Sequence, residues 1–542
     1  MTTNTGSSPA LTLEELDEDA RNLAFDQVQS RMPEVWKRMR LNEPGESVVV
    51  VPSVTVDRVV AQGGALNQAM EERFLFLLLL LRQPRLRMIY VTSMPINPSI
   101  VEYYLALLPG VIPSHARARL SLVAVGDSSS RPLTEKLLAR PRLLAQITSL
   151  IPDQLRSHLV PYNTTSLERD LSIMLGIPMY GADPRLFPLG TKTGCKRLFS
   201  EAGVHCPAGF EDLRSVADVV RALTALRSQR PDVGEAMVKL NEGVSGKGNA
   251  VVNLRDLPPP GDPLEAVALE QRLQLMELED EDITAGAFLD KLQERGGIAE
   301  ELITGEELRS PSVQLRITPA GDIELLSTHD QVLGGPSGQS YLGCIFPADP
   351  AYARTITRDA LLVGEILAKK GVLGRFALDF VVVRRGQTWT SYAIEVNLRK
   401  GGTTHPFLTL QFLTDGRYHP DTALFLTPAG RERHLVATDH LEDPSLKGLR
   451  VDDLFDLVAR SGIHFDQARQ TGVVFHMISC LTELGRVGMT AVGESPAAAQ
   501  AVYDRAERIL LQEARASMVP RPLGGSSRAG SVAQSPGEWP ER

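Results

Sequence analysis

The first pattern of apolar and polar positions lies between residues 45 and 190. Apolar runs that are short enough for buried strands stand at 48–51, 88–92 and 120–125. Stretches with helical spacing lie around them, at 66–81, 98–108 and 133–151. Strands that alternate with helices are typical of a parallel sheet covered by helices. The pattern predicts an α/β domain at 45–190, preceded at 1–44 by a helical, partly disordered segment that breaks near Pro33.

Alternating apolar and polar positions predict two β-hairpins in the second half of the chain. One joins 313–317 to 323–327, and the other joins 378–383 to 390–396 through a turn at 384–387. An amphipathic helix at 353–371 separates them.

The second hairpin brings acidic side chains together. A turn centred near Gln387 places Asp379 opposite Glu395, where Cβ atoms of cross-strand neighbours lie about 5 Å apart. Asn397 follows on the same face as Glu395. Adjacent carboxylates need a shared proton or a cation, and this set of oxygens suits Mg²⁺. Arg399 comes two residues later and suits an anionic group beside the metal. The alternative is a polar hairpin rim with solvated side chains.

Composition and charge narrow the function classes. The chain has 542 residues, enough for several domains, and a net charge of −9 that argues against a large nucleic-acid surface. The four cysteines have no CxxC spacing, which favours a reducing compartment, and no signal peptide is visible, so we expect a cytoplasmic protein. The apolar run 74–81 is shorter than the ~20 residues that span a bilayer, so it predicts a buried helix and no membrane association.

Two weaker motifs contain lysines. Lys192 and Lys196 share one face of a helix that begins after Thr191 and ends at Gly203, and taken alone they are solvated side chains. Lys239 ends a strand before a loop with Gly243, Gly246 and Gly248, whose N–H groups could cradle phosphate oxygens. This is not a Walker A loop, because Gly248 rather than Ser or Thr follows Lys247. A plain flexible turn is the alternative.

A short strand at 298–303 leads into a turn at Gly305. Its backbone could meet an adenine edge and Glu307 could reach a ribose hydroxyl, whereas the alternative is an edge strand with solvated glutamates. The pair His329–Asp330 has no serine or cysteine nucleophile beside it in the sequence, so we do not assign it a catalytic role.

The order of these motifs carries more information than any one of them. A lysine-headed helix, the segment VKLNEGVSGKGN, the segment THDQ and finally EVNLRKGGTTHP follow one another between residues 191 and 406. This order resembles the ATP-grasp superfamily, and more narrowly the pheganomycin-type peptide ligases and the ATP-grasp domain of eukaryotic IQ-motif-containing relatives. The resemblance covers residues from about 45 to 518.

The resemblance implies a role for each matching position. Residues implied to hold ATP are the lysines Lys192 and Lys239, the loop residues Gly243, Ser245, Gly246, Lys247 and Gly248, the adenine linker Glu300, Glu301 and Leu302, and the ribose-binding Glu307. Asp379, Glu395 and Asn397 match Mg²⁺ ligands. Arg399 matches an arginine near the transferred phosphate, and Arg316 matches a phosphate or intermediate contact.

The resemblance also implies the domain order. An N-terminal Rossmann-like pre-ATP-grasp domain at 45–190 precedes a two-lobed ATP-grasp domain, with lobes at 191–310 and 311–430. A small, mostly helical C-terminal module follows at 431–518 and either covers the site or mediates contacts in a homodimer. The tail at 519–542 is rich in Pro, Gly, Ser and Arg and is predicted to be disordered.

The implied activity is ATP-dependent ligation of a small-molecule carboxylate to an amine, forming a peptide or amide bond through an acyl phosphate and releasing ADP and phosphate. ATP and Mg²⁺ are the implied cofactors, and amino acids or peptides are the implied substrates. Two alternatives remain: a phosphotransferase on the same scaffold, and a nucleotide-binding regulatory protein without turnover. The segment Arg399–His405 departs from the amino-acid ligases most often compared, so the resemblance assigns it no substrate role.

Overall fold

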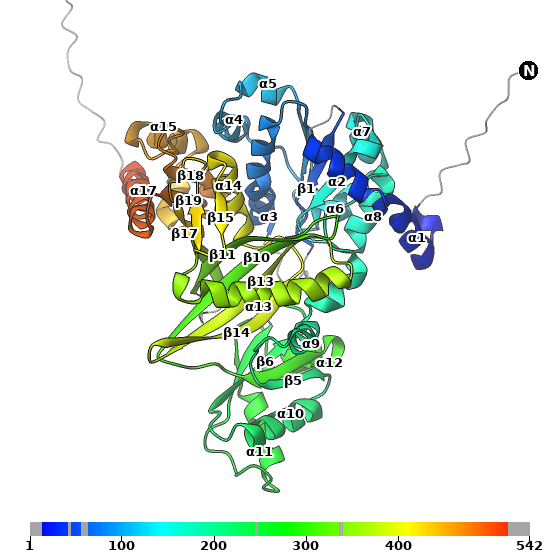
Figure 1. Cartoon of the computed structure of the whole chain (residues 1–542), viewed down its shortest axis with the longest axis vertical. Coiled ribbons are helices and arrows are strands. Elements are labelled where there is room, and N and C mark those ends of the chain that lie inside the picture. Colours follow the sequence, from blue (N-terminus) through cyan, green and yellow to red (C-terminus); the bar gives the residue numbers. More distant parts are fainter. Residues whose placement is uncertain are drawn as a thin grey trace, which may run out of the picture.

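The computed structural model describes residues 13–41, 45–55, 63–243, 248–280, 282–334, 338 and 340–518. Within them the chain forms a four-stranded, a five-stranded and an eight-stranded sheet, and a two-stranded sheet of β15 (Arg417–His419) and β16 (Leu424–Leu426). In Figure 1 the five-stranded sheet forms the lower end of the molecule, and the eight-stranded sheet crosses its middle. Ser245, Gly246 and Lys247 of the predicted loop, and the predicted tail 519–542, lie outside the described residues.

The first domain is the predicted parallel sheet. Its strands are β1 (Ser47–Val51), β2 (Arg87–Thr92), β3 (Leu120–Ala124) and β4 (Ser157–Pro161), in the order β3-β2-β1-β4. The first three confirm the prediction, whereas β4 was not predicted. It is short and ends in proline, so its sequence gives little strand signal.

Helices cover both faces of this sheet. The long stretch predicted at 133–151 is divided by Pro141, and the N-terminal helix breaks at residues 30–31 rather than at Pro33, which lies in a first turn where proline is tolerated. The helices are α1 (Glu18–Gln29), α2 (Met32–Leu41), α3 (Gly63–Glu72), α4 (Pro98–Ala106), α5 (Pro113–Arg117), α6 (Leu133–Leu138), α7 (Pro141–Leu150) and α8 (Ser166–Leu175).

The apolar run at 74–81 is buried, as predicted. It forms the 3₁₀ helix η3 (Arg73–Arg82), in which the side chains of Phe74–Leu79 and Leu81 are at most 6% exposed. η3 packs against α4 and against α14 (Thr404–Thr414), so its apolar surface joins the first domain to the central part of the molecule. No helix in the described part of the chain is both long enough and apolar enough to cross a membrane.

The five-stranded sheet forms a separate lobe with its own core. Its strands are β5 (Gly209–Leu213), β6 (Glu235–Leu240), β7 (Asn249–Asn253), β8 (Glu277–Leu278) and β9 (Gly297–Glu301), in the antiparallel order β5-β9-β6-β7-β8. The helices α10 (Val216–Gln229), α11 (Glu265–Gln274) and α12 (Ala285–Arg295) complete the lobe. Helix α9 (Lys192–Ala202) contacts both this lobe and β14 of the central sheet.

The central sheet is antiparallel and larger than the two predicted hairpins. Its order is β14-β13-β10-β11-β12-β17-β19-β18, with α13 (Pro350–Lys369) across one face (Figure 1). The strands are β10 (Glu307–Ile317), β11 (Ile323–Gly334), β12 (Ser340–Phe346), β13 (Gly374–Arg385), β14 (Thr388–Asn397), β17 (His434–Glu442), β18 (Gly472–His476) and β19 (Arg486–Gly493). The residues predicted as a C-terminal module therefore extend this sheet with three strands, and α15 (Val451–Ser461), α16 (Cys480–Leu484) and α17 (Pro496–Met518) pack beside them.

The register of β13 and β14 decides where the acidic side chains point. The turn pairs Arg385 with Thr388, and continued without interruption this register would set Asp379 opposite Ile394. A β-bulge between Asp379 and Phe380 shifts the pairing by one residue, so that Asp379 faces Glu395 as predicted. Alternate residues of β13, such as Leu378 and Phe380, enter the core beneath α13, which leaves Asp379 on the opposite face.

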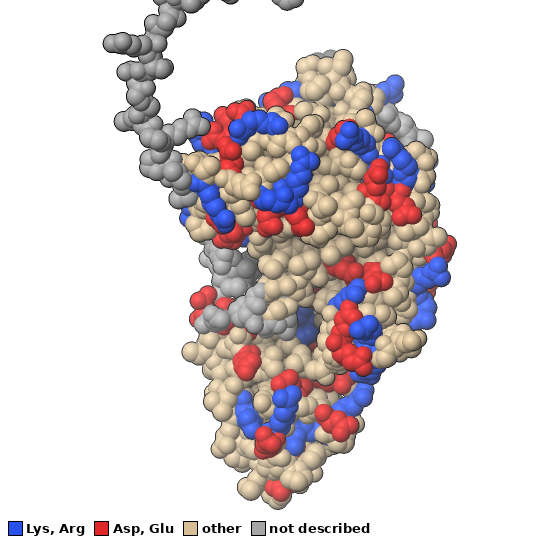
Figure 2. Space-filling view, turned by 90° about the vertical axis from the view of Figure 1, so that its left-hand side faces the viewer, with Lys and Arg blue, Asp and Glu red and all other residues tan. Residues whose placement is uncertain are grey.

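The face shown in Figure 2 carries Lys and Arg interspersed with Asp and Glu, and on it no large area has charge of one sign.

Two buried histidines make the fold sensitive to acid. Burial lowers the pKa of His329 to about 3, and burial, with Lys400 as a second cause, lowers that of His158 to about 4. The unfolded chain binds these protons near pH 6.5, so stability falls as the pH drops from about 6.5 toward the folded-state pKa, by about 1.4 kcal/mol per pH unit for each histidine. We expect a lower thermal midpoint at pH 5 than at pH 7.

The variant His329→Asn isolates one contribution, because asparagine does not titrate in this range. Its thermal midpoint should fall less between pH 7 and pH 5 than that of the wild type. An equal fall in both proteins would show that His329 is not held neutral.

Candidate active site

The site is built on the hairpin of β13 and β14. The Asn397 amide donates from Nδ2 to Oδ2 of Asp379 over 2.9 Å, which leaves its amide oxygen available as a metal ligand. From β11, Nε2 of Gln331 donates to Oδ1 of Asp379 over 3.1 Å. On the other strand of the hairpin, Oε2 of Glu395 forms an ion pair with Nζ of Lys192 at 2.5 Å. The predicted metal ligands therefore lie on one face and in direct reach of one another.

The two carboxylates differ in their electrostatic state. Burial, and then the neighbouring Glu395, raises the pKa of Asp379 to about 6. Burial alone would also raise the pKa of Glu395, but the Lys192 ammonium outweighs it and holds that pKa below its ordinary value. Negative charge is therefore crowded at Asp379 and only partly compensated, which is a situation that a cation relieves.

Helix α9 presents Lys192 to the hairpin. Thr191 caps it by accepting the N–H of Gly194, and Gly203 ends it with a positive φ of 64°, as predicted. Asn241 binds the start of this helix to the end of β6, because its carbonyl and side-chain oxygens accept the N–H groups of Lys192 and Thr193. The predicted alternative of a solvated Lys192 is wrong, since the residue is 8% exposed.

A second buried cluster surrounds Glu300. Lys239 from β6 lies 2.7 Å from its Oε1, and Lys196 from α9 lies 3.2 Å from its Oε2. Burial would raise the pKa of Glu300, but the two ammonium groups outweigh it and lower it. Lys196 also donates to the carbonyl of Pro207 over 2.7 Å, so it too is not a solvated side chain.

The other linker residues have separate contacts. Glu301 points away from the lysines and accepts the N–H of Ala208 over 2.9 Å, and Leu302 is half-buried beyond the end of β9. Glu307 begins β10, where its carboxylate is paired with Arg309 and Arg384 at 2.7 and 3.2 Å. Glu307 therefore has no contact with the lysine cluster.

A cavity of about 220 Å³ opens beside the hairpin, where the first domain and both lobes meet. Arg399 lines it beside Glu395 and Asn397, and its guanidinium lies 5.9 Å from the ring centre of Tyr162. Gly243 lines the cavity too, and the carbonyl of Gly248 accepts the Leu240 N–H over 2.8 Å, which fixes the base of the glycine loop. Other lining residues come from the first domain and from the end of α12: Thr55, Asn163, Thr164, Thr165, Lys291 and Arg295.

Arg316 is not brought to this cavity. It lies four residues beyond Ser312, the residue of β10 that faces Asp379, and at about 3.3 Å per residue this is roughly 13 Å along the strand. Its guanidinium pairs with Glu324 and lies over the ring of Trp36 at 5.1 Å. The structure therefore does not bring Arg316 together with the other predicted site residues, because Arg316 lies in a separate cluster with Glu324 and Trp36 of α2.

The structure adds residues that the sequence did not assign. Gln331 and Ser312 both hydrogen-bond to Asp379, and Lys196 shares Glu300 with Lys239. Gln331 belongs to the quoted THDQ segment, and Lys196 stands one helical turn after Lys192. Both residues stand out in the sequence, but only the strand register and the packing of the lobe show where their side chains point.

The small-residue segment after the hairpin is used internally. Helix α14 starts at Thr404, and the N–H of Gly401 donates to the Thr404 hydroxyl over 2.9 Å. Gln314 of β10 contacts the hydroxyls of Thr403 and Thr404.

The residues fit Mg²⁺ and a nucleotide. Asp379, Glu395 and the Asn397 amide supply the oxygen atoms that a hard divalent cation prefers, and burial beside Glu395 raises the pKa of Asp379, which a bound cation would lower. Lys192 stands where it can leave Glu395 for a phosphate.

Comparison with known proteins agrees with this geometry. The family described as "IQCH-like, ATP-grasp" matches residues 186–266 and 267–419, which include both lobes of the site. Over these residues the chain is similar to ATP-grasp proteins. A second family, the PGM1 C-terminal domain, matches residues 453–506.

Relatives of this chain include the L-propargylglycine–L-glutamate ligase of Streptantibioticus cattleyicolor, which is 29% identical over 89% of this chain and 98% of its own length. The IQ motif-containing protein H of Danio rerio is 24% identical over 80% of this chain, and the match spans 45% of that protein. The biotin carboxylase domain of Hydrogenobacter thermophilus 2-oxoglutarate carboxylase has the same fold, with a TM-score of 0.51, 13% identity, and coverage of 85% and 89% of the two chains.

Removing the charge of Glu300 should destabilise the lobe. In Glu300→Gln, Lys196 and Lys239 keep their buried positions without a counter-charge, and breaking a buried pair in this way costs about 3–5 kcal/mol. Urea unfolding followed by hydrogen exchange of β6 and β9 measures the loss.

Glu301→Gln is the matched control, because glutamine keeps an oxygen that accepts the Ala208 N–H. It should unfold at nearly the wild-type urea concentration. Equal destabilisation of the two variants would contradict the assigned role of Glu300.

Proposed function

We propose that this protein is an ATP-dependent ligase that joins a small-molecule carboxylate to an amine and releases ADP and phosphate. The observation that carries the proposal is the Asp379–Glu395–Asn397 oxygen set, in which Glu395 pairs with Lys192 and in which Glu395 and Asn397 line a cavity between the lobes. Its relative of 29% identity is itself named as a ligase of two amino acids, which favours an amino acid or short peptide on each side of the reaction.

The reaction needs positioning and charge rather than a nucleophilic side chain. A substrate carboxylate oxygen attacks the γ-phosphorus of ATP, the bond to the β-phosphate oxygen breaks, and ADP leaves. The amine nitrogen then attacks the acyl carbon, phosphate leaves, and the nitrogen gives up a proton. Both steps gather negative charge on phosphate oxygens, which cations in a site of low dielectric stabilise.

The chain supplies those cations from separate elements. Lys192 on α9 and Lys239 on β6 enter from the lobe and its helix, and Arg399 enters from the end of β14. We assign the two lysines to the ATP phosphates and Arg399 to the transferred phosphate. Bound Mg²⁺, held by Asp379, Glu395 and Asn397, would neutralise charge on the phosphates.

The glycine loop and the linker complete the proposed nucleotide site. Gly243–Gly248, including Ser245, Gly246 and Lys247, would close over the phosphates, and the backbone at 300–302 would meet the adenine. The Glu307 carboxylate is already paired with two arginines, so the proposed ribose contact requires it to leave at least one of them.

The setting proposed for the reaction is the cytoplasm. The four cysteines are free thiols, as they are in proteins of reducing compartments.

Loss of one metal ligand should abolish turnover. We expect ADP release from Mg²⁺ATP only when a carboxylate and an amine are both present in pools of amino acids and short peptides, and a fall of at least about 100-fold in Glu395→Gln. Coupled ADP detection measures the rate, and mass spectrometry of the reacting pool identifies the product.

Glu324→Gln is the control, because this carboxylate pairs with Arg316 away from the cavity. Nucleotide binding without ADP release in every pool would favour a regulatory protein, and ADP release with a phosphorylated acceptor and no amide would favour a phosphotransferase. Either result would contradict the ligase.

Arg399 and Arg316 should respond differently to the same change. Arg399→Lys loses the planar guanidinium at the cavity and should lower kcat/KM by about 100-fold. Arg316→Lys should leave kcat/KM close to the wild-type value, because that guanidinium contacts Glu324 and Trp36 instead. Steady-state kinetics of both variants at equal thermal stability tests the assignment, and equal losses would overturn it.

A further inference from the structure

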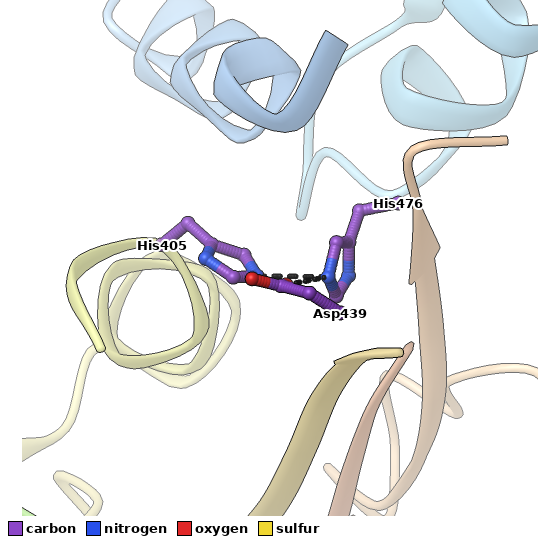
Figure 3. Close-up of side chains that lie close together, drawn as sticks. All are labelled: His405, Asp439 and His476. Atoms are coloured by element: carbon purple, nitrogen blue, oxygen red, sulfur yellow. Dashed lines mark hydrogen bonds and ion pairs between the residues drawn. The ribbon is translucent and has the colours of Figure 1, made fainter. Parts of the chain in front are cut away.

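Three buried side chains from distant segments meet between α14 and the strands β17 and β18. His405 comes from α14, Asp439 from β17 and His476 from the end of β18, and Figure 3 shows the three pointing toward one another. Nε2 of His476 lies 2.8 Å from Oδ1 of Asp439 and 3.0 Å from Nε2 of His405, and the third separation is 3.7 Å. Each side chain is at most 6% exposed.

The backbone is shaped to hold this arrangement. Gly488 of β19 lies beneath the ring of His476, and a Cβ atom there would be 2.2 Å from Nε2. Met477 adopts a positive φ of 55° directly after His476, which is uncommon for a non-glycine residue. Asp439 lies at an irregularity in the pairing of β17 with β19, where a bulge re-aims a side chain.

Protons alone do not satisfy the cluster. Arg73 donates from Nε to Nδ1 of His405 over 3.0 Å, so neutral His405 carries its proton on Nε2 and directs it at His476. Nε2 of His476 must then accept that proton and, at the same time, donate one to Asp439. A ring nitrogen cannot do both, so one of the contacts sets two lone pairs or two N–H groups against each other.

We propose that His405, Asp439 and His476 bind a divalent transition-metal ion, with Zn²⁺ as the ion of choice. Two imidazole nitrogens and one carboxylate oxygen are a common donor set for zinc. Zinc bonds of about 2.0–2.2 Å at tetrahedral angles separate the ligand atoms by about 3.3–3.6 Å. The separations here, 2.8, 3.0 and 3.7 Å, therefore need two pairs of side chains to move apart by about half an ångström on binding. A cation among the three atoms gives every lone pair a partner.

An outer shell for the metal is also present. Arg73 pairs with Oδ2 of Asp439 at 2.5 Å, which leaves Oδ1 for the ion. When the metal takes Nε2 of His405, the ring proton moves to Nδ1, so the Arg73 Nε–H must move away from that nitrogen, and the Gly402 carbonyl is within hydrogen-bonding reach to accept the ring proton. That carbonyl already accepts from Arg73 over 3.0 Å and has a second lone pair. An imidazole N–H held by a backbone carbonyl is a usual support of a metal ligand.

The position of the cluster defines its role. It joins α14, which directly follows the hairpin of the active site, to the strands that extend the central sheet toward the C-terminus. The site is buried and joins these segments, so the role that we assign to it is structural, and it is chemically distinct from the all-oxygen set at Asp379. The proposal does not depend on the nucleotide site.

Metal analysis of the full chain without an affinity tag tests the proposal. Protein incubated with Zn²⁺ and then desalted should retain about one zinc per chain by mass spectrometry of the metal, and His405→Gln and His476→Gln should each retain less than about a tenth of that. His440→Gln is the matched control, because it removes the neighbouring histidine of β17 that lies outside the cluster. Zinc-free wild type, or full retention in either cluster variant, overturns the proposal.

X-ray absorption at the zinc edge of the wild type keeps the test independent of how the variants fold. The spectrum should show nitrogen and oxygen ligands with the outer-shell scattering of two imidazoles. Sulfur ligands would place the metal on cysteines and would also overturn the proposal.

Discussion

The structure depends on two carboxylates that are forced together inside the protein. The bulge between β13 and β14 sets Asp379 opposite Glu395, and burial makes their repulsion expensive. The surrounding groups reduce this repulsion. An amide from the same strand, a glutamine from β11 and an ammonium from α9 each supply positive charge or a hydrogen bond, and a divalent cation would supply more.

Buried ion pairs also connect the elements around the cavity. Lys192 joins α9 to β14, whereas Lys196 and Lys239 join α9 and β6 to β9 through Glu300. Each pair stabilises the protein only while both partners are present, because an uncompensated buried charge is costly. A nucleotide phosphate can replace the carboxylate partner of a lysine, and binding would then redistribute charge without leaving any of it unpaired. This exchange is the physical link between the packing of the lobes and the proposed chemistry.

Much of this could be predicted from sequence, and the failures have physical causes. Period-two patterning predicted the hairpin, but it did not predict the bulge, which comes from packing. The observed turn has Gly386 and Gln387 at its tip and is one residue tighter than a turn centred on Gln387. Ile394 is the extra, unpaired residue of β14 that restores the pairing of Asp379 with Glu395. The strand β17 was missed because Thr438 and Asp439 are polar yet buried, which disrupts its alternation. The lysines were predicted as solvated in isolation, since only tertiary contacts reveal Glu300 and Glu395 as their partners. Arg316 was misplaced because its cluster with Trp36 joins segments nearly 300 residues apart in the sequence.

A crystal structure of the protein with Mn²⁺ and a non-hydrolysable ATP analogue tests the central claim most directly. The account predicts anomalous manganese density bounded by Asp379, Glu395 and Asn397, with Lys192 moved from Glu395 to a phosphate oxygen. Nucleotide bound in the cavity with no manganese at these residues, or bound elsewhere with the Lys192–Glu395 pair intact, would contradict it.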